Sequence, residues 1–339
     1  MNLRNIFIVV LLLFCNSAFS QPAADSLKAI IDKSVQLMEE NSLHRKEINW
    51  KEFKEKVYLQ TRGIKTIDSL VTQYPLFFKW LNDFHGAVTL DGKWIKWRDG
   101  RPSRKMNAMM DSVFKRGPGL KVDRWDDIGY FRMPPVPALG PDIPKWTQKL
   151  VDSLCRISPA TAKGWIIDLR LNGGGNIWPM LTSLASLIGE GTVGGIKYID
   201  GREDSRSFIE QSKPFGNNQF YSIPNQTCAL PTSDLPVAIL IGPATGSSGE
   251  GLLLAFKGRP NTVIIGEPSA GYVTSNSNWP LHKRVELFLA TGYMKDRQGN
   301  YYTDSIQPDL FIKDGDDFYQ PGQDLKISKA KEWLKTRMK

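Results

Sequence analysis

The segment from Val237 to Gly271 constrains the fold more than any other part of this 339-residue chain. Its β-rich apolar start, Val237 to Ile241, predicts a buried strand, and the small residues that follow predict a tight loop. A helical pattern begins directly behind Ser247 and Ser248. A strand, a tight turn and a helix in this order place a serine hydroxyl beside free backbone N–H groups, which can stabilise an oxyanion during acyl transfer.

The same serines have a plainer explanation as helix caps. Serine is a preferred N-cap residue, and Glu250 lies three positions after Ser247, where it would complete a capping box. On this segment alone, a cap at Ser247 or Ser248 is the commoner outcome, because serine caps outnumber serine nucleophiles. A catalytic interpretation therefore needs support from elsewhere in the chain.

A second glycine loop supplies that support. Asn172-Gly173-Gly174-Gly175 follows the apolar run Trp165 to Leu169, just as the serine loop follows its own strand. If the two strands are neighbours, both loops open at the same edge of the sheet, where α/β folds bind ligands. Consecutive glycines let backbone N–H groups approach a reacting carbonyl, although a phosphate-binding loop or a plain turn is the alternative. Neither loop matches the G-x-G-x-x-G or Walker pattern, so phosphate is the weaker interpretation.

The rest of the chain sets the fold class and the expected partners. Strand and helix patterns alternate from about Val122 onward, which predicts an α/β core, and helical patterns dominate residues 24–84. The formal charge of +9 comes from dispersed lysines and arginines, so we expect no nucleic-acid partner. A composition that is 41% hydrophobic and 23% charged is typical of a globular protein rather than a disordered one.

The amino terminus predicts export. Arg4 precedes an uncharged apolar run at Ile6 to Phe14, and small residues lead to an expected cleavage after Ser20. The run is shorter than the ~20 apolar residues of a membrane span, so we expect no transmembrane segment in the mature chain. We therefore expect a periplasmic or extracellular protein. Membrane attachment through a lipidated Cys15 is a weaker alternative, because Leu13-Phe14 fits a lipoprotein processing site poorly.

Several motifs together resemble the tail-specific, or carboxy-terminal processing, serine peptidases of family S41. These motifs are IIDLRLNGGG, GPATGSSGEGLLLAFKGRPNTVIIGEPSAG, LNDFHG at Leu81 to Gly86, IQPD at Ile306 to Asp309, and the helical KEINWKEF. The resemblance spans residues 24–312 and implies a crotonase-like or ClpP-like α/β core of ββα units behind a small helical amino-terminal domain. It also implies an exported serine endopeptidase that cleaves a peptide or protein substrate through an acyl-enzyme.

The resemblance also assigns residues to the site. Ser247 falls on the nucleophile and Glu250 on the acid of the S-x-x-E motif. Gly174 and Gly175 fall on functionally sensitive glycines of the oxyanion site, and Ser248 is expected to supply a backbone N–H.

The expected base departs from the Ser-Lys type. Peptidases of that type carry a lysine just after the segment corresponding to GEPSAG, and here that position is Tyr272. A tyrosine, whose ordinary pKa is near 10, is a poor base at neutral pH. The sequence instead resembles the tricorn-like branch, whose base is a histidine in a D-x-H motif, and Asp83-Phe84-His85 matches it. The other two histidines, His44 and His282, lie in charged and solvated surroundings, so we expect His85 to be the base.

The sequence does not fix the acid that would orient His85. Asp304 and Asp296 both lie in the carboxy-terminal β region, and the resemblance aligns neither cleanly onto the family's acid. This gap leaves open a catalytically inactive, peptide-binding protein with the same fold. A crotonase-like acyl-transfer enzyme is a further alternative, which the export signal disfavours because CoA chemistry is mainly intracellular.

These patterns divide the chain into four parts. They are a signal peptide at 1–20, a helical domain at 21–95, a connector at 96–121 and an S41-like catalytic domain at 122–339, with no PDZ-like insert. Within them, GKWIKW predicts a strand or hairpin, and residues 190–235 predict mostly loops with a short strand near 195–199. Cys155 and Cys228 remain after export, and the sequence leaves open whether they pair. No Cys/His cluster has metal-ligand spacing, so we expect no metal and no cofactor, while the oligomeric state is not indicated.

Overall fold

The computed structural model of the protein describes residues 27–97, 106–199 and 201–338. The expected signal peptide at 1–20 and Cys15 lie outside these ranges, as do residues 98–105 of the expected connector. Within the described ranges, no helix combines the length and the apolar character that crossing a bilayer requires.

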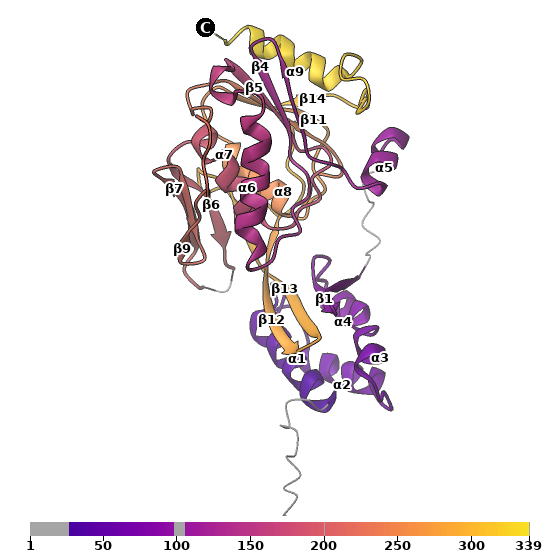
Figure 1. Ribbon diagram of the computed structural model, residues 1–339. Helices are drawn as coiled ribbons and strands as arrows, with labels where there is room; N and C mark the ends of the chain where they lie inside the picture. Colours follow the sequence, from indigo (N-terminus) through magenta and orange to yellow (C-terminus); the bar gives the residue numbers. More distant parts are fainter. Residues whose placement is uncertain (1–26, 98–105, 200, 339) are drawn as a thin grey trace, which may run out of the picture.

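In this part of the chain, the elements follow one another from helices to a mixture of strands and helices (Figure 1). The helices are α1 (Leu27–Asn41), α2 (Trp50–Gln60), α3 (Ile67–Val71), α4 (Tyr74–Trp80), α5 (Ala108–Lys115), α6 (Asp142–Cys155), the 3₁₀ turn η2 (Pro159–Thr161), α7 (Ile177–Ile188), α8 (Ser248–Phe256) and α9 (Leu325–Lys335). The strands are β1 (Ala87–Leu90), β2 (Lys93–Lys96), β3 (Lys121–Trp125), β4 (Ile128–Arg132), β5 (Gly164–Asp168), β6 (Gly191–Lys197), β7 (Ser205–Glu210), β8 (Lys213–Gly216), β9 (Gln219–Phe220), β10 (Val237–Ile241), β11 (Thr262–Gly266), β12 (Thr274–His282), β13 (Val285–Lys295) and β14 (Leu310–Phe311).

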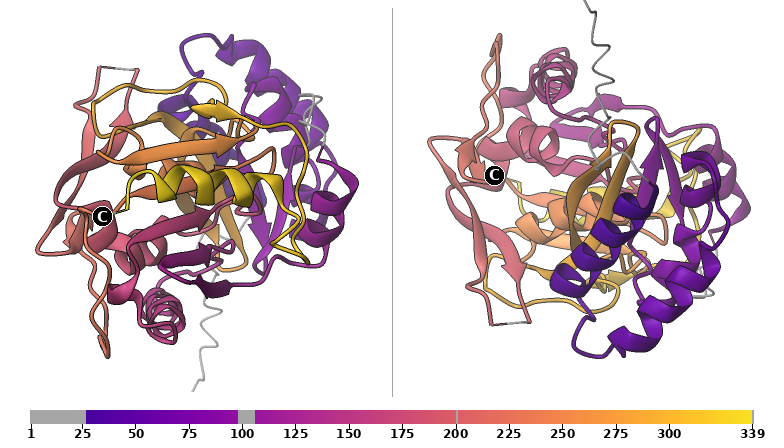
Figure 2. Two further views of the ribbon diagram at one scale, coloured as in Figure 1. Left: turned by 90° about the horizontal axis from the view of Figure 1, so that it is seen from above. Right: turned by 90° about the horizontal axis from the view of Figure 1, so that it is seen from below.

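A mostly parallel sheet with the order β14-β11-β10-β5-β4-β3 forms the core, and its β3 edge is antiparallel. Successive side chains of a strand point to opposite faces of the sheet, and every residue of β5 and β10 is buried, so both faces of the sheet are covered. Ile167 and Ile239 pack under α6, α7 and α8, whereas Ile166 and Leu240 pack under α9 on the opposite face. Figure 2 shows α9, in yellow, lying across the strands. The expected α/β core is confirmed, with β5 and β10 as parallel neighbours, so their loops leave the same edge.

A second, antiparallel sheet joins the core to the amino-terminal helices. Its order is β2-β1-β13-β6-β7-β8-β9, and β12 pairs with β13. Helices α1 to α4 gather around β1 and the β12–β13 hairpin, at the end of the molecule opposite α9 (Figure 1). Leu281, Leu287 and Leu289 of that hairpin share one apolar cluster with Val35 and Phe77 of the helices. The helical region therefore completes its core with strands that lie about two hundred residues later in the chain.

Two parts of the chain differ from the sequence expectations, and the structure decides a third point that the sequence left open. The expected connector contains α5, which Asn107 caps by accepting a hydrogen bond from the backbone N–H of Met110. Residues 190–235, expected to be mostly loops with a short strand near 195–199, contain four strands, β6 to β9, of which β6 overlaps the expected strand. Cys155, at the end of α6, forms a disulfide with Cys228 and fixes the loop that follows β9.

Candidate active site

Ser247 lies between β10 and α8, as the strand–turn–helix pattern predicts. Its backbone adopts φ 53° and ψ −123°, a conformation that residues with a side chain rarely adopt. Such strain persists where surrounding contacts hold it, and it clusters at functional sites. Here the Ser247 N–H donates to Oε2 of Glu250 at 2.9 Å, which fixes the turn. The Glu250 half of the expected capping box is thus present, while the Ser247 hydroxyl faces a histidine.

That histidine, His85, lies in the loop between α4 and β1. Asp83 fixes this loop, because its buried carboxylate accepts hydrogen bonds from the backbone N–H groups of His85, Gly86 and Ala290. Asn276 of β12 donates to the His85 carbonyl at 2.8 Å. Burial raises the pKa of Asp83, although these backbone donors act in the opposite direction. The Asp of the D-x-H motif therefore positions the backbone of the histidine, and strands β12 and β13 support it.

The structure brings His85 and Ser247 together from opposite ends of the sequence. The imidazole Nε2 lies 3.1 Å from the Ser247 hydroxyl, and Nδ1 lies 2.7 Å from the hydroxyl of Thr274. Tyr272 packs edge-on against the imidazole, with 5.2 Å between the ring centroids. Tyr272, the residue that the sequence comparison sets against the lysine of Ser-Lys peptidases, thus borders the histidine.

The two acids considered from the sequence bond elsewhere. Asp296 accepts hydrogen bonds from the Tyr302 hydroxyl at 2.8 Å and from nearby backbone groups, and Asp304 accepts one from the N–H of Ser305 at 2.7 Å. The group on Nδ1 of the histidine is the Thr274 hydroxyl. Sequence analysis missed Thr274 because it belongs to no motif and begins a strand, β12, that the sequence did not predict.

The glycine loop lies directly against the serine. Gly174 and Gly175 both have φ +112°, which favours glycine, and a Cβ added at Gly174 would lie 2.7 Å from Cβ of Ser247. The N–H of Gly174 donates to the side chain of Asn172, so it is engaged. The N–H groups of Gly175 and Ser248 make no hydrogen bond to any described residue. The Ser248 hydroxyl donates to the Gly175 carbonyl at 2.6 Å and ties the two loops together.

Glu250 is fully buried under the serine turn. Its Oε1 accepts hydrogen bonds from the Ser269 hydroxyl at 2.6 Å and from the N–H of Gly271 at 2.7 Å. Burial raises the pKa of Glu250 to about 7, although the hydrogen bonds act to lower it. Because its other oxygen holds the N–H of Ser247, this carboxylate links the serine turn to the loop that precedes β12.

A buried cluster of ion pairs lies at the end of β5, directly before the glycine loop. Arg170, in the DLR sequence just before the loop, bonds to Asp168, Asp316 and Asp324 at 2.7 Å each. Burial raises the pKa of Asp168, but the guanidinium of Arg170 outweighs this and holds the pKa below its usual value. The cluster connects the end of β5 to the carboxy-terminal segment.

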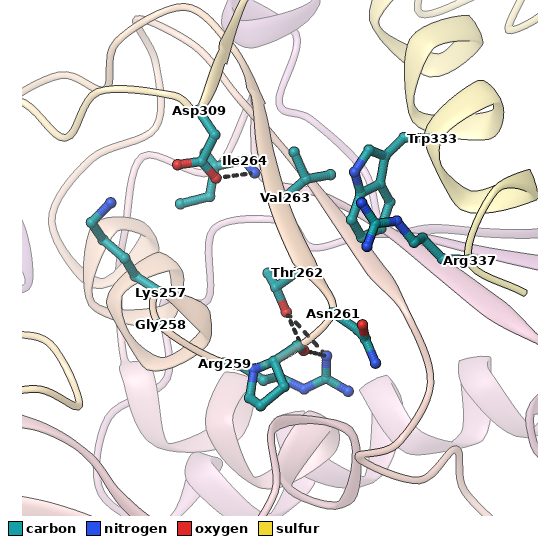
Figure 3. Close-up of a pocket in the computed structure, with 11 residues that line it drawn as sticks. Lys257, Gly258, Arg259, Asn261, Thr262, Val263, Ile264, Asp309, Trp333 and Arg337 are labelled. Carbon is teal, nitrogen blue, oxygen red and sulfur yellow. Dashed lines mark hydrogen bonds between the residues drawn. The ribbon is translucent and has the colours of Figure 1, made fainter.

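A cleft of about 2210 Å³ lies over the serine and the histidine. Both glycine loops, β2, β6, β7 and residues 134–139 line it. A smaller hollow of about 530 Å³ lies between β11 and α9 (Figure 3). There Asp309, of the IQPD motif, bonds to the N–H of Ile264, and Arg259 bonds to Thr262 and to backbone carbonyls. These groups serve the packing of the core. The described residues contain no cluster of three His, Cys, Asp or Glu side chains able to hold a metal ion.

A serine on a strained strand-to-helix turn, hydrogen-bonded to a histidine on an α/β core, is the arrangement of serine hydrolases. The sequence model of peptidase family S41 matches residues 127–312, which is more than half of the chain. The chain belongs to peptidase family S41.

Known proteins agree with this assignment. The nisin-resistance protein of Lactococcus lactis subsp. lactis is 32% identical over 180 residues, which cover 52% of this chain and 51% of that protein. The match therefore spans about half the length of this curated relative. A lipoprotein from Streptococcus agalactiae has a TM-score of 0.70 at 22% identity, with 95% of this chain and all of that chain covered. A peptidase described as putative, from Parabacteroides merdae, has a TM-score of 0.57 at 17% identity, with 91% and 96% covered. These two structures share the fold.

Proposed function

We propose that the protein is an exported serine endopeptidase in which Ser247 is the nucleophile and His85 is the general base. The observation that carries this proposal is the 3.1 Å contact between Nε2 of His85 and the hydroxyl of Ser247. The disulfide and the expected signal peptide support an oxidising compartment outside the cytoplasm. The names of two similar proteins, a nisin-resistance protein and a lipoprotein, support a peptide substrate and a place at the cell envelope.

The mechanism follows from the positions of the polar groups. Ser247 Oγ attacks the peptide carbonyl while Nε2 of His85 takes the hydroxyl proton, and the Nδ1–H donates to Thr274. The developing oxyanion accepts hydrogen bonds from the N–H groups of Gly175 and Ser248. His85 then gives its proton to the leaving amine. Water, activated by the same imidazole, hydrolyses the acyl-enzyme and releases the carboxylate product.

The domain division at 21–95, 96–121 and 122–339 is part of this proposal, with one addition. The β12–β13 hairpin of the catalytic domain packs into the helical domain, and β12 also carries the Thr274 that contacts the histidine. We therefore assign the helical domain the task of holding the base in place.

A serine-directed fluorophosphonate probe, located by peptide mass, tests the proposed function. We expect labelling at Ser247, loss of labelling in Ser247→Ala, and a fall in turnover of roughly 10³-fold or more in His85→Ala. His282→Ala is the matched control for loss of an imidazole, because this residue lies at the far end of β12. Labelling that persists in Ser247→Ala, or a wild-type protein that is never labelled, would favour an inactive peptide-binding protein instead.

A further inference from the structure

Strand β2 presents one face to the cleft and the other to the amino-terminal helices. Residues directly opposite one another in antiparallel strands share a face. Lys96 pairs with Ala87, which in turn pairs with Phe288, so these three side chains project to the same side. Ile95 projects to the other side and packs against the helical cluster, although it also borders the cleft. Lys96 thus belongs to the face that lines the cleft, together with Trp94 two residues earlier.

These residues form a compact group close to the base. The rings of Trp94 and Phe288 meet at 4.6 Å across β1, and the ammonium of Lys96 lies 5.0 Å from the centre of the Trp94 ring. Ala87, the neighbour of Lys96, follows His85 by two residues. Neighbouring strands are about 5 Å apart, so the backbone of Lys96 lies about one strand spacing from the chain segment that carries the imidazole.

The charge of Lys96 is not balanced within the described part of the protein. No acidic side chain there lies within ion-pair distance of it, whereas Lys295 in the same cleft bonds to Asp204 at 3.0 Å. Solvent reaches Lys96 in the cleft, yet the surrounding protein lowers the pKa of its ammonium by desolvation. An anion bound beside Lys96 would offset that desolvation. The rings of Trp94 and Phe288, on the same face, would contact an apolar part of the same bound molecule.

We propose that Lys96, with Trp94 and Phe288, forms a substrate subsite that binds a carboxylate on the leaving side of the scissile bond. This inference rests on the proposed function, which decides on which side of the scissile bond the subsite lies. The oxyanion donors hold the acyl part of the substrate, and His85 must face the leaving amine to protonate it. The segment beyond that amine then lies over β1 and β2, where Lys96 projects. Two sources supply the same chemistry, namely the α-carboxylate of a peptide that ends close to the bond and an Asp or Glu side chain.

Peptides that differ in one carboxylate test the subsite and distinguish the two sources. A pool of random-sequence decapeptides, in free-acid and amidated versions, is first incubated with the enzyme, and cleaved sequences are identified by mass. One cleaved peptide is then compared in its free-acid and amidated forms, which tests the terminal carboxylate. The amidated form is also made with Glu or with Gln at each leaving-side position, which tests a side-chain carboxylate. A charge-assisted hydrogen bond predicts a preference of roughly 10- to 100-fold in kcat/KM for one carboxylate form, expressed mainly in KM.

The preference should depend on Lys96. We expect Lys96→Met to reduce the acid-to-amide or Glu-to-Gln ratio to near one, and Lys96→Arg to retain most of it. Lys93→Met is the matched control, because Lys93 lies on the same strand but shares the opposite face with Ile95. The ratio is taken within each variant, so a partly unfolded population does not alter it. A wild-type enzyme indifferent to both carboxylates, or an unchanged ratio in Lys96→Met, would overturn the proposal.

Failure of catalysis and failure of the subsite give different results. Fluorescein-labelled acid and amide pools are titrated with the Ser247→Ala protein, and binding is followed by anisotropy, which needs no turnover. If the fluorophosphonate does not label Ser247 but the acid pool still binds more tightly in a Lys96-dependent manner, the subsite stands and the peptidase mechanism does not. Equal binding of both pools, together with equal binding of the Glu and Gln forms of the amidated peptide, by a protein whose parent labels normally would refute the subsite alone.

Discussion

Replacing Gly175 with alanine tests the glycine loop directly. Gly175 has φ +112°, and an added Cβ would lie 2.2 Å from the carbonyl oxygen of Val136. That carbonyl accepts the N–H of Asn176 at 2.7 Å, and the Val136 N–H donates to the Gly174 carbonyl at 3.0 Å. The neighbour is backbone and cannot rotate away, so the loop must move and lose these two hydrogen bonds.

The cost has two separable parts. Backbone strain of about 1–3 kcal/mol, with about 1 kcal/mol for each lost hydrogen bond, lowers the free energy of unfolding by roughly 3–5 kcal/mol. For a chain of this size, that corresponds to a melting temperature lower by about 5–10 °C. Displacement of the Gly175 N–H from the proposed oxyanion site lowers turnover by a further 10²- to 10³-fold, roughly the effect of removing one such donor.

Melting curves and peptide cleavage rates, measured on the same preparations, separate the two parts. Gly173→Ala is the matched control, because Gly173 lacks a positive φ and its added Cβ would meet the Phe114 ring at 3.3 Å, a side chain that can adjust. We expect Gly173→Ala to melt and turn over much like the parent. A Gly175→Ala protein with the parent's melting temperature and rate would show that the loop does not lie against Val136 as described and does not act in catalysis.

Three further outcomes are expected. Thr274→Val should lower kcat about tenfold through loss of the hydroxyl on the imidazole, whereas Thr274→Ser, which keeps it, should stay close to the parent. Ser248→Ala should cost about 2- to 10-fold in kcat, because it loses one hydrogen bond to Gly175 but keeps its backbone N–H. Burial raises the pKa of Asp168, but the guanidinium of Arg170 outweighs this effect and lowers the pKa in the folded state. The ionised Asp168 therefore stabilises the fold above its unfolded-state pKa near 4, and this stabilisation is lost as the pH falls from there through the lower folded-state pKa. Denaturation midpoints from pH 6 to pH 3 should drop less steeply in Asp168→Asn.

Local patterns in the sequence identified the parts of the site that lie on single elements. Alternation of apolar runs and small-residue loops located Ser247 and Gly174, because a buried strand followed by a tight turn leaves a distinct composition. Because histidine is scarce in this chain, His85 was the expected base, and in the structure its Nε2 lies 3.1 Å from the Ser247 hydroxyl. The helices of the amino-terminal region and the strands of the parallel core were predicted for the same reason.

The antiparallel sheet was predicted only in part, at GKWIKW and near residues 195–199, which overlap β2 and β6. Strand β12 carries Asn276 and begins at Thr274, yet its alternation is irregular and its register shifts between Ser275 and Asn276. Half-exposed strands of this kind are specified by their partners more than by their own residues. Helix α5 was also missed, because the polar residues around its Asn107 cap are typical of a loop as well.

By itself, the sequence determined the fold class, the family and the two residues of the proposed dyad, since these rest on local motifs and on the order of apolar and polar segments along the chain. The tertiary structure alone decided which group contacts Nδ1 of His85, because Thr274 lies 189 positions away and reaches the imidazole through β12. It also decided that the N–H of Gly174 bonds to Asn172 while that of Gly175 has no partner among the described residues, and that Lys96 lines the cleft while Lys93 does not. Strand pairing and backbone hydrogen bonds set these relations, and they depend on distant segments that no local pattern records.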